Sequence, residues 1–301
     1  MSFPVSTGIN VVKDLQFTIQ TTRDTIPASP TFTMVGNTQE ITPNSDMNSV
    51  TRRRLGSPDF YRVSKTGERF NFDFAYTPVD KVLLSKAINL AADDATHNRD
   101  NILAFAVSQM MNVSGTLTEK YLVPIGAQCD STSIDISIED CAVGMTWIPL
   151  DIPLPNATPP GITGTPTWAT PISAEPWHGI SGLLNPFSWN AVNKQIMGFS
   201  CTVNNNINQI QVLGNANLFA GLPTLRDISF TLDMLYEDDV MAGDVESMTP
   251  RAMEMKLSSD TKLVFTNAYL TNYTETFSAT STDVKMHTYN GVSQKVVVTT
   301  I

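Results

Sequence analysis

Apolar residues recur at every second position in several stretches of the chain. Such alternation is typical of strands, because successive side chains of a strand point to opposite faces of its sheet. The alternating apolar sets are Leu15, Phe17 and Ile19; Phe70, Phe72, Phe74 and Tyr76; Ile134, Ile136 and Ile138; Met197, Phe199, Cys201 and Val203; Ile228, Phe230, Leu232 and Met234; and Leu263, Phe265 and Tyr269. The pattern predicts a mainly β fold, with antiparallel sheets packed on one face as a sandwich or barrel.

One segment has helical spacing instead. Thr77 offers an N-cap, Pro78 a first helical residue and Asp80 a carboxylate at the capping-box position. The apolar positions behind them follow a single helical stripe: Val79, Val82, Leu83, Ala87 and Leu90. We therefore expect one flanking α-helix over about 78–92, lying across a sheet.

Other local signals concern a second helix and two turns. A short helix is expected after the Glu237-Asp238-Asp239 cluster, limited by Gly243 and Pro250. Asn204-Asn205-Asn206 and Asn290-Gly291 stand between alternating runs. The second of these predicts a hairpin with a type I′ turn, because asparagine followed by glycine accepts positive φ angles.

Prolines gather in the middle of the chain. Residues 149–176 hold eight of the 18 prolines, which excludes interior strands there. We interpret 149–186 as a connection or insertion between two β-rich parts, 11–148 and 187–301. The whole chain, 1–301, is then treated as a single composite domain.

Three segments are candidates for arms that fold onto neighbouring molecules. The stretch 42–67 is long, polar and unusually basic for this chain, and a loop of that length usually has a function. The two chain ends, 1–10 and 288–301, are either too polar or have too few pairing partners to be stable alone.

Charge and composition narrow the possible functions. The chain of 301 residues has a formal net charge of -10 and is poor in charged residues overall, at 16%. A net negative charge repels phosphate, so tight nucleic-acid binding is not expected. The N-terminus does not resemble a secretion signal, and no apolar run approaches the ~20 residues of a membrane span. The product is therefore expected to stay in the cytosol when it is made, without a membrane partner.

Residues for catalysis or metal binding are not grouped. His97, His178 and His287 are scattered, and no phosphate-binding loop or nucleophile motif occurs. The cysteines, Cys129, Cys141 and Cys201, are odd in number and lack metal-binding spacing, so we interpret them as buried free thiols. We predict a protein that is not an enzyme and has no catalytic site, cofactor or metal. A hydrolase using Asp238 or Asp239 is a weaker option.

Tryptophans supply an alternative function. Trp147, Trp168, Trp177 and Trp189 bracket the proline-rich connection, and exposed tryptophan is a common platform for sugars. The alternative is therefore a sugar-binding β-sandwich, such as a receptor-binding or adhesin module. Tryptophans that are buried or anchor a loop are the commoner case.

The order of several short phrases points to a family. An opening strand is followed by IPASPTF at 26–32, GNTQEI at 36–41, the long loop with RLGSPD at 54–59, and then the Phe-rich strand and its capped helix. After the proline-rich connection come FSCTVNNNI at 199–207, RDISFTLD at 226–233 and YEDD at 236–239. Over nearly its whole length the chain resembles the major tail tube proteins of long-tailed viruses of bacteria and archaea.

The resemblance implies a structural role. In that family a β-sandwich with a flanking helix forms hexameric rings, and the stacked rings form the hollow tube through which the genome leaves the particle. The implied partners are copies of the chain itself, other tail proteins at the tube ends, and viral DNA that passes through without specific binding. The implied location is the tail of the virion, after assembly in the host cytoplasm.

Two sets of candidate residues follow from this expectation. Candidates for the subunit interface come from the long loop, whose arginines would pair with carboxylates of a neighbour: Arg52, Arg53, Arg54, Leu55, Asp59, Phe60 and Tyr61. Candidates for the wall of the lumen are carboxylates that would repel DNA: Asp73, Asp135, Glu139, Asp227 and Asp233.

Overall fold

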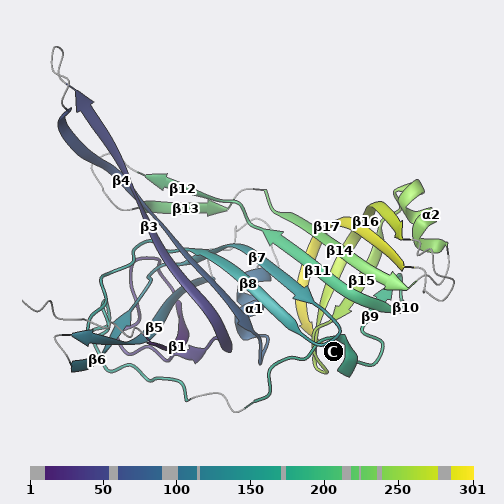
Figure 1. Ribbon diagram of the computed structural model, residues 1–301, viewed down its shortest axis with the longest axis horizontal. Helices are drawn as coiled ribbons and strands as arrows, with labels where there is room; N and C mark the ends of the chain where they lie inside the picture. Colours follow the sequence, from purple (N-terminus) through teal and green to yellow (C-terminus); the bar gives the residue numbers. More distant parts are fainter. Residues whose placement is uncertain are drawn as a thin grey trace, which may run out of the picture.

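The computed structural model describes residues 11–53, 60–89, 101–113, 116–170, 174–211, 218–223, 225–235, 239–276 and 286–301 (Figure 1). Its strands are β1 (Val11–Gln20), β2 (Thr33–Met34), β3 (Asn37–Arg53), β4 (Phe60–Thr77), β5 (Ile102–Val113), β6 (Thr116–Leu122), β7 (Gln128–Ile136), β8 (Cys141–Ile148), β9 (Phe187–Trp189), β10 (Val192–Lys194), β11 (Ile196–Asn204), β12 (Ile207–Gln211), β13 (Leu218–Pro223), β14 (Asp227–Leu235), β15 (Arg251–Lys256), β16 (Thr261–Thr276) and β17 (Met286–Thr300). The helices are α1 (Val82–Ile88), α2 (Val240–Ser247) and the short 3₁₀ helix η1 (Ile180–Gly182).

The strands form two main sheets and a small hairpin. The large sheet has the order β10-β9-β15-β16-β17-β14-β11-β7-β8-β4-β3, and the second sheet has the order β2-β1-β5-β6. Strands β12 and β13 pair with each other. All pairings between these strands are antiparallel. The predicted fold class, a mainly β antiparallel architecture with a flanking helix, is confirmed.

The second sheet packs on the inner face of the large one. Phe105 of β5 lies 5.1 Å from the ring of Phe72, 5.5 Å from that of Phe74 and 5.1 Å from that of Trp147. Phe72, Trp147 and Phe105 are completely buried. The alternation in 70–76 therefore has the predicted cause, since one face of β4 forms the centre of the sandwich.

The large sheet also curls toward itself. Strands in a sheet lie about 4.8 Å apart, so β16 would be about 14 Å from β11 if the sheet were flat, because two strands separate them. The rings of Phe265 on β16 and Phe199 on β11 are nevertheless 6.1 Å apart. Phe265 also lies 5.8 Å from Phe230 of β14. This part of the sheet encloses its own apolar core, as in a partly closed barrel.

The flanking helix is shorter than predicted. It starts at Val82, where Asp80 Oδ1 accepts a hydrogen bond from the Val82 amide, and not at Pro78, whose carbonyl accepts from the Trp177 amide instead. Its end at Ile88 is set by Asn89, the C-cap residue. The predicted residues 90–92 lie outside the described part of the chain.

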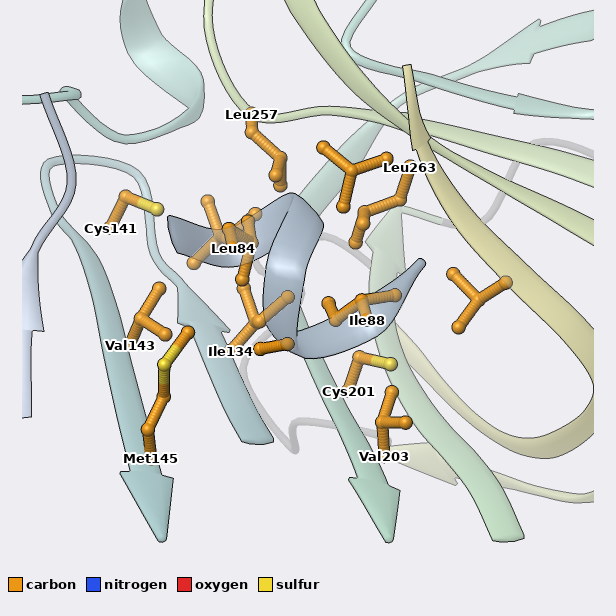
Figure 2. Packing of buried hydrophobic residues seen from close by; sticks show 14 of the residues in the cluster. Leu84, Ile88, Ile134, Cys141, Val143, Met145, Cys201, Val203, Leu257 and Leu263 are labelled. Atoms are coloured by element: carbon orange, nitrogen blue, oxygen red, sulfur yellow. The ribbon is translucent and has the colours of Figure 1, made fainter. Parts of the chain in front are cut away.

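Helix α1 covers the inner face of the central strands. Figure 2 shows Leu84 and Ile88 pointing toward Ile134 of β7 and Cys201 of β11. All three cysteines are free and buried, as predicted. Burial raises the pKa of each thiol to about 12, so the thiols are uncharged and act as small apolar side chains in this core.

The second predicted helix is α2, and one carboxylate fixes it to the large sheet. Asp244 accepts hydrogen bonds from Trp189 Nε1 at 2.8 Å and from Arg251 Nη2 at 2.8 Å. Burial by itself would raise the pKa of Asp244, but the hydrogen bonds from Arg251 and Trp189 outweigh it, so the pKa is lower than usual.

The prediction of a hairpin turn at Asn290-Gly291 is wrong. Both residues lie inside β17, between β14 and β16. Glycine is needed there because a Cβ atom would lie 2.3 Å from Phe230 Cζ and 2.5 Å from the carbonyl oxygen of Tyr269. The expected turn at 204–206 is confirmed, since β11 ends at Asn204 and β12 begins at Ile207.

The expected C-terminal arm is also wrong. Residues 288–301 belong largely to β17, which pairs with β16 along its whole length and with β14 up to Val292. Val296 and Val298 are buried in the main core. The segment has its partners within the same molecule, so it is part of the sheet and not a free arm. The N-terminal candidate, 1–10, lies outside the described residues.

Four positions of the alternating sets that are predicted to face a core do not. Met197 is half-buried, because a register shift between Ile196 and Gly198 places Ile196 in the core instead. Ile19 and Ile138 are exposed, the latter because it lies in the turn between β7 and β8. Tyr269 is half-buried, because Asn267 has a φ of 51° and the alternation shifts to Ala268 and Leu270.

The long polar segment at 42–67 is not a loop. Its described residues continue β3 and β4, which pair with each other from Asn37 and Thr77 out to Arg53 and Phe60. Since β8 pairs with β4 only over 72–76, the remainder of this hairpin projects away from the body (Figure 1). In contrast, the described part of the proline-rich connection, 149–186, contains no β-strand beyond isolated bridges, as predicted.

Candidate functional site: the polar face of the large sheet

The outer face of the large sheet carries rows of polar residues that run across the strands. In each row, neighbouring residues are direct partners on adjacent strands. The rows are Thr42, Asp73, Thr146, Ser131, Asn204 and Asp227; Glu40, Ala75, Gly144, Ser133, Thr202 and Ser229; Ala142, Asp135, Ser200, Thr231, Asn290 and Asn272; and Gly198, Asp233 and Thr288. We call this set the polar face. None of its residues is buried, whereas most of their neighbours along the strands are.

The polar face is acidic. It contains the carboxylates of Glu40, Asp73, Asp135, Asp227 and Asp233, and no lysine or arginine belongs to its rows. Arg226 lies next to Asp227, but its guanidinium donates to the Ile88 carbonyl oxygen at the end of α1, on the inner side of the sheet. All charged side chains in the rows of the polar face are therefore negative.

The surface has little relief. Apart from the carboxylates, its side chains are those of serine, threonine, asparagine, alanine and glycine, which extend only a short way above a sheet. Two shallow depressions lie on it, one lined by Glu40, Asp73 and Thr146 and the other by Asp135, Gly198 and Asp233. Such a surface offers no deep cleft in which a small molecule could be enclosed.

Hydrogen bonds from neutral donors hold several side chains of the polar face. Thr288 Oγ1 donates to Asp233 Oδ1 at 2.6 Å, and Asn206 Nδ2 donates to Asp227 Oδ2 at 2.9 Å. Thr231 Oγ1 donates to Asn290 Oδ1 at 2.8 Å. These donors are uncharged, so they orient Asp233 and Asp227 without offsetting the negative charge, as a lysine or arginine partner would.

The structure brings together four of the five lumen candidates. Asp73, Asp135, Asp227 and Asp233 lie on the polar face, although they come from three strands far apart in sequence. Glu139 does not, because it lies in the turn between β7 and β8 and is exposed at the end of the sheet. Glu40 was not predicted. A register shift between Thr38 and Glu40 interrupts the alternation in β3, so the sequence pattern gave no usable signal.

The interface candidates lie where the β3–β4 hairpin is farthest from the body. Arg52 pairs with Arg62 across the two strands, and Arg53 pairs with Phe60. Tyr61 follows in β4. Arg54, Leu55 and Asp59 are outside the described residues.

The tryptophans do not form an exposed platform. Trp147, Trp177 and Trp189 are buried. Trp168 is half-buried and stacks on Phe32, with 4.8 Å between ring centroids, and on Tyr121, with 5.0 Å. It holds the proline-rich connection against the second sheet, which is the anchoring role that was the commoner expectation.

The described residues provide neither a metal centre nor a membrane helix. Within them, no three or more histidine, cysteine, aspartate or glutamate side chains are grouped so that they could hold a metal ion. No helix in the same part of the chain has the length and apolar character needed to cross a bilayer.

Comparison with known proteins leaves the site to be interpreted from its own geometry. No protein-family model matches the sequence, and no curated protein shows significant similarity to it.

Proposed function

We propose that the protein is a structural subunit of a viral tail tube. In this proposal copies of the chain form rings, the rings stack into a hollow cylinder, and the polar face lines the passage for DNA. The protein has no catalytic task in this role. Its partners are other copies of itself and the tail proteins at the ends of the tube.

The polar face is the observation that carries the proposal. Double-stranded DNA bears one negative charge per ~1.7 Å of axis, and lysine or arginine on a wall would bind it by releasing counterions. The polar face has carboxylates on five strand positions and no cation in its rows. Together with its low relief, this arrangement would let a polyanion pass without being held.

The projecting hairpin also favours an assembled protein. A two-stranded ribbon is at best marginally stable by itself in water. Strands β3 and β4 pair with each other well beyond the last residue of β8 that supports them. A contact with a neighbouring subunit would stabilise this extension.

The sugar-binding alternative has no comparable support. Stacking on a sugar needs an exposed aromatic face, and each tryptophan is either buried or stacked on other rings.

Electron microscopy of the purified full-length protein tests the proposal. We expect rings or hollow cylinders at high protein concentration, and these assemblies should not retain linear double-stranded DNA at low salt. A protein that stays monomeric at every concentration, or assemblies that bind DNA tightly at low salt, would contradict the proposal.

A charge reversal on the polar face makes the test of the lumen specific. Asp135 is exposed in the middle of a row, so Asp135→Lys combined with Glu40→Lys should leave the fold intact. Cylinders of this variant should retain DNA, and raising the salt concentration should release it. The matched control is Glu246→Lys with Asp24→Lys, which makes the same charge change at exposed positions outside the polar face.

A further inference from the structure

We infer that the two ends of the large sheet are complementary in charge and bind each other in successive copies of the chain. The β3–β4 hairpin of one copy contacts the turn between β7 and β8 and the neighbouring segment 174–180 of the next. This inference rests on the proposed function, since it specifies how copies associate along the axis of an assembly.

The hairpin end is basic. The described residues of this end, 51–53 and 60–69, contain five lysines and arginines and one acidic residue, a net charge of +4 in a chain of -10. In the backbone register of the hairpin, Arg52 and Arg62 are direct cross-strand partners. From Phe60 to Asn71 the strand β4 extends about 35 Å at 3.3 Å per residue, enough to reach into a neighbour.

The β7–β8 turn lies at the opposite end of the same sheet. Strands β4 and β8 are antiparallel, with Phe72 paired with Trp147 and Tyr76 with Val143. The first residue of β8, Cys141, therefore lies near the last residue of β4, Thr77. The hairpin leaves the sheet at the other end of β4. The basic part of the hairpin and the β7–β8 turn therefore lie at opposite ends of β4.

That opposite end is acidic and exposed. Glu139, Asp140 and Glu175 are exposed, and the segment carrying Glu175 is joined to the turn by the backbone bridge between Asp140 and His178. Asp80 is also exposed. It lies close to this segment, because the Trp177 amide donates a hydrogen bond to the Pro78 carbonyl oxygen. Lys81, the next residue, forms its hydrogen bond with Thr300 and not with these carboxylates.

Complementary patches at opposite ends of one molecule give a head-to-tail contact. Such a contact differs from the self-matching interface of a two-fold dimer, because each copy keeps one patch of each kind free for the next copy. Repetition therefore produces an open stack. Because the contact joins oppositely charged segments, it should weaken as salt screens it.

Charge-reversal variants of the full-length chain test the contact. Glu139→Lys/Glu175→Lys and Arg52→Glu/Arg53→Glu should each raise the protein concentration needed for assembly by at least about tenfold, because like charges would face each other. Mixing or combining the two reversals should restore assembly toward the wild-type concentration. The control Glu246→Lys/Asp24→Lys, with exposed carboxylates elsewhere, should assemble as the wild type does.

Light scattering as a function of concentration and salt gives the readout, and circular dichroism melting confirms that each variant is folded. If the wild type assembles and Glu139→Lys/Glu175→Lys assembles equally well, the contact is overturned while the tube proposal stands. Failure of the combined variant to recover also overturns the contact. A wild type that never assembles overturns both.

Discussion

The side-chain amide of Asn89 is hydrogen-bonded to both backbone groups of Val298. The Val298 amide donates to Asn89 Oδ1 at 2.6 Å, and Asn89 Nδ2 donates to the Val298 carbonyl oxygen at 2.9 Å. Strand β14 pairs with β17 only up to Val292, so the side chain occupies an edge position that a strand would otherwise fill. The end of α1 is thereby fixed to the last strand of the chain.

Asn89→Ala should destabilise the protein by about 1–3 kcal/mol, because the buried amide and carbonyl of Val298 would lose this partner. Urea denaturation measures the loss as a lower midpoint. Asn193→Ala, at an exposed position of β10, is the control and should change stability by less than about 0.5 kcal/mol. Equal stability of the two variants would show that the Asn89 contact contributes nothing.

Gly291→Ala should cost about 1–3 kcal/mol, because the added methyl group would overlap Phe230 and the Tyr269 carbonyl oxygen. Gly243→Ala is the matched control. It lies in α2 with no atom within 4 Å of the added Cβ, and alanine there should raise stability by about 0.5–1 kcal/mol. Thermal denaturation of both variants checks the contrast. Similar melting temperatures would contradict the packing described for β17.

The hydrogen bonds to Asp244 should make stability depend on pH in the acid range. Its pKa is lower in the folded protein than the usual ~3.9, so the stabilisation is present above that value and is lost as the pH falls through the folded pKa. Asp244→Asn should therefore be less stable than the wild type at pH 7, by about 1.5–3 kcal/mol, with a smaller difference near pH 3.

Urea denaturation at pH 7, 5 and 3 measures this change. Glu246→Gln, at an exposed position of the same helix, is the control and should follow the wild type at each pH. A difference between Asp244→Asn and the wild type that stays constant from pH 7 to pH 3 would argue against an ionised Asp244 as the hydrogen-bond acceptor.

The alternation of apolar residues was sufficient to predict which faces of the central strands are buried. Phe72, Ile134 and Phe230 lie in the core as expected, because side-chain direction along a strand depends only on position within it. The same reasoning failed at Tyr269, where the positive φ of Asn267 interrupts the period. A single backbone angle of this kind leaves little trace in the apolar pattern.

The candidate site was only partly predictable. Asp73 and Asp227 could be assigned to the polar side of their own strands, but their place in one row follows from the register of β4, β8, β7, β11 and β14. Register is set by pairings between distant segments. Glu139, three residues after the end of β7, is not on the polar face because the strand ends before it.

The sequence by itself determined the class of fold, the two helical segments and the burial of the three thiols, since these depend on local spacing and side-chain polarity. The tertiary structure decided that Asn290-Gly291 lies within a strand and that 42–67 forms a projecting hairpin. Both outcomes depend on neighbours that are remote in the chain. Phe230 requires the glycine, and β8 ends where β3 and β4 continue.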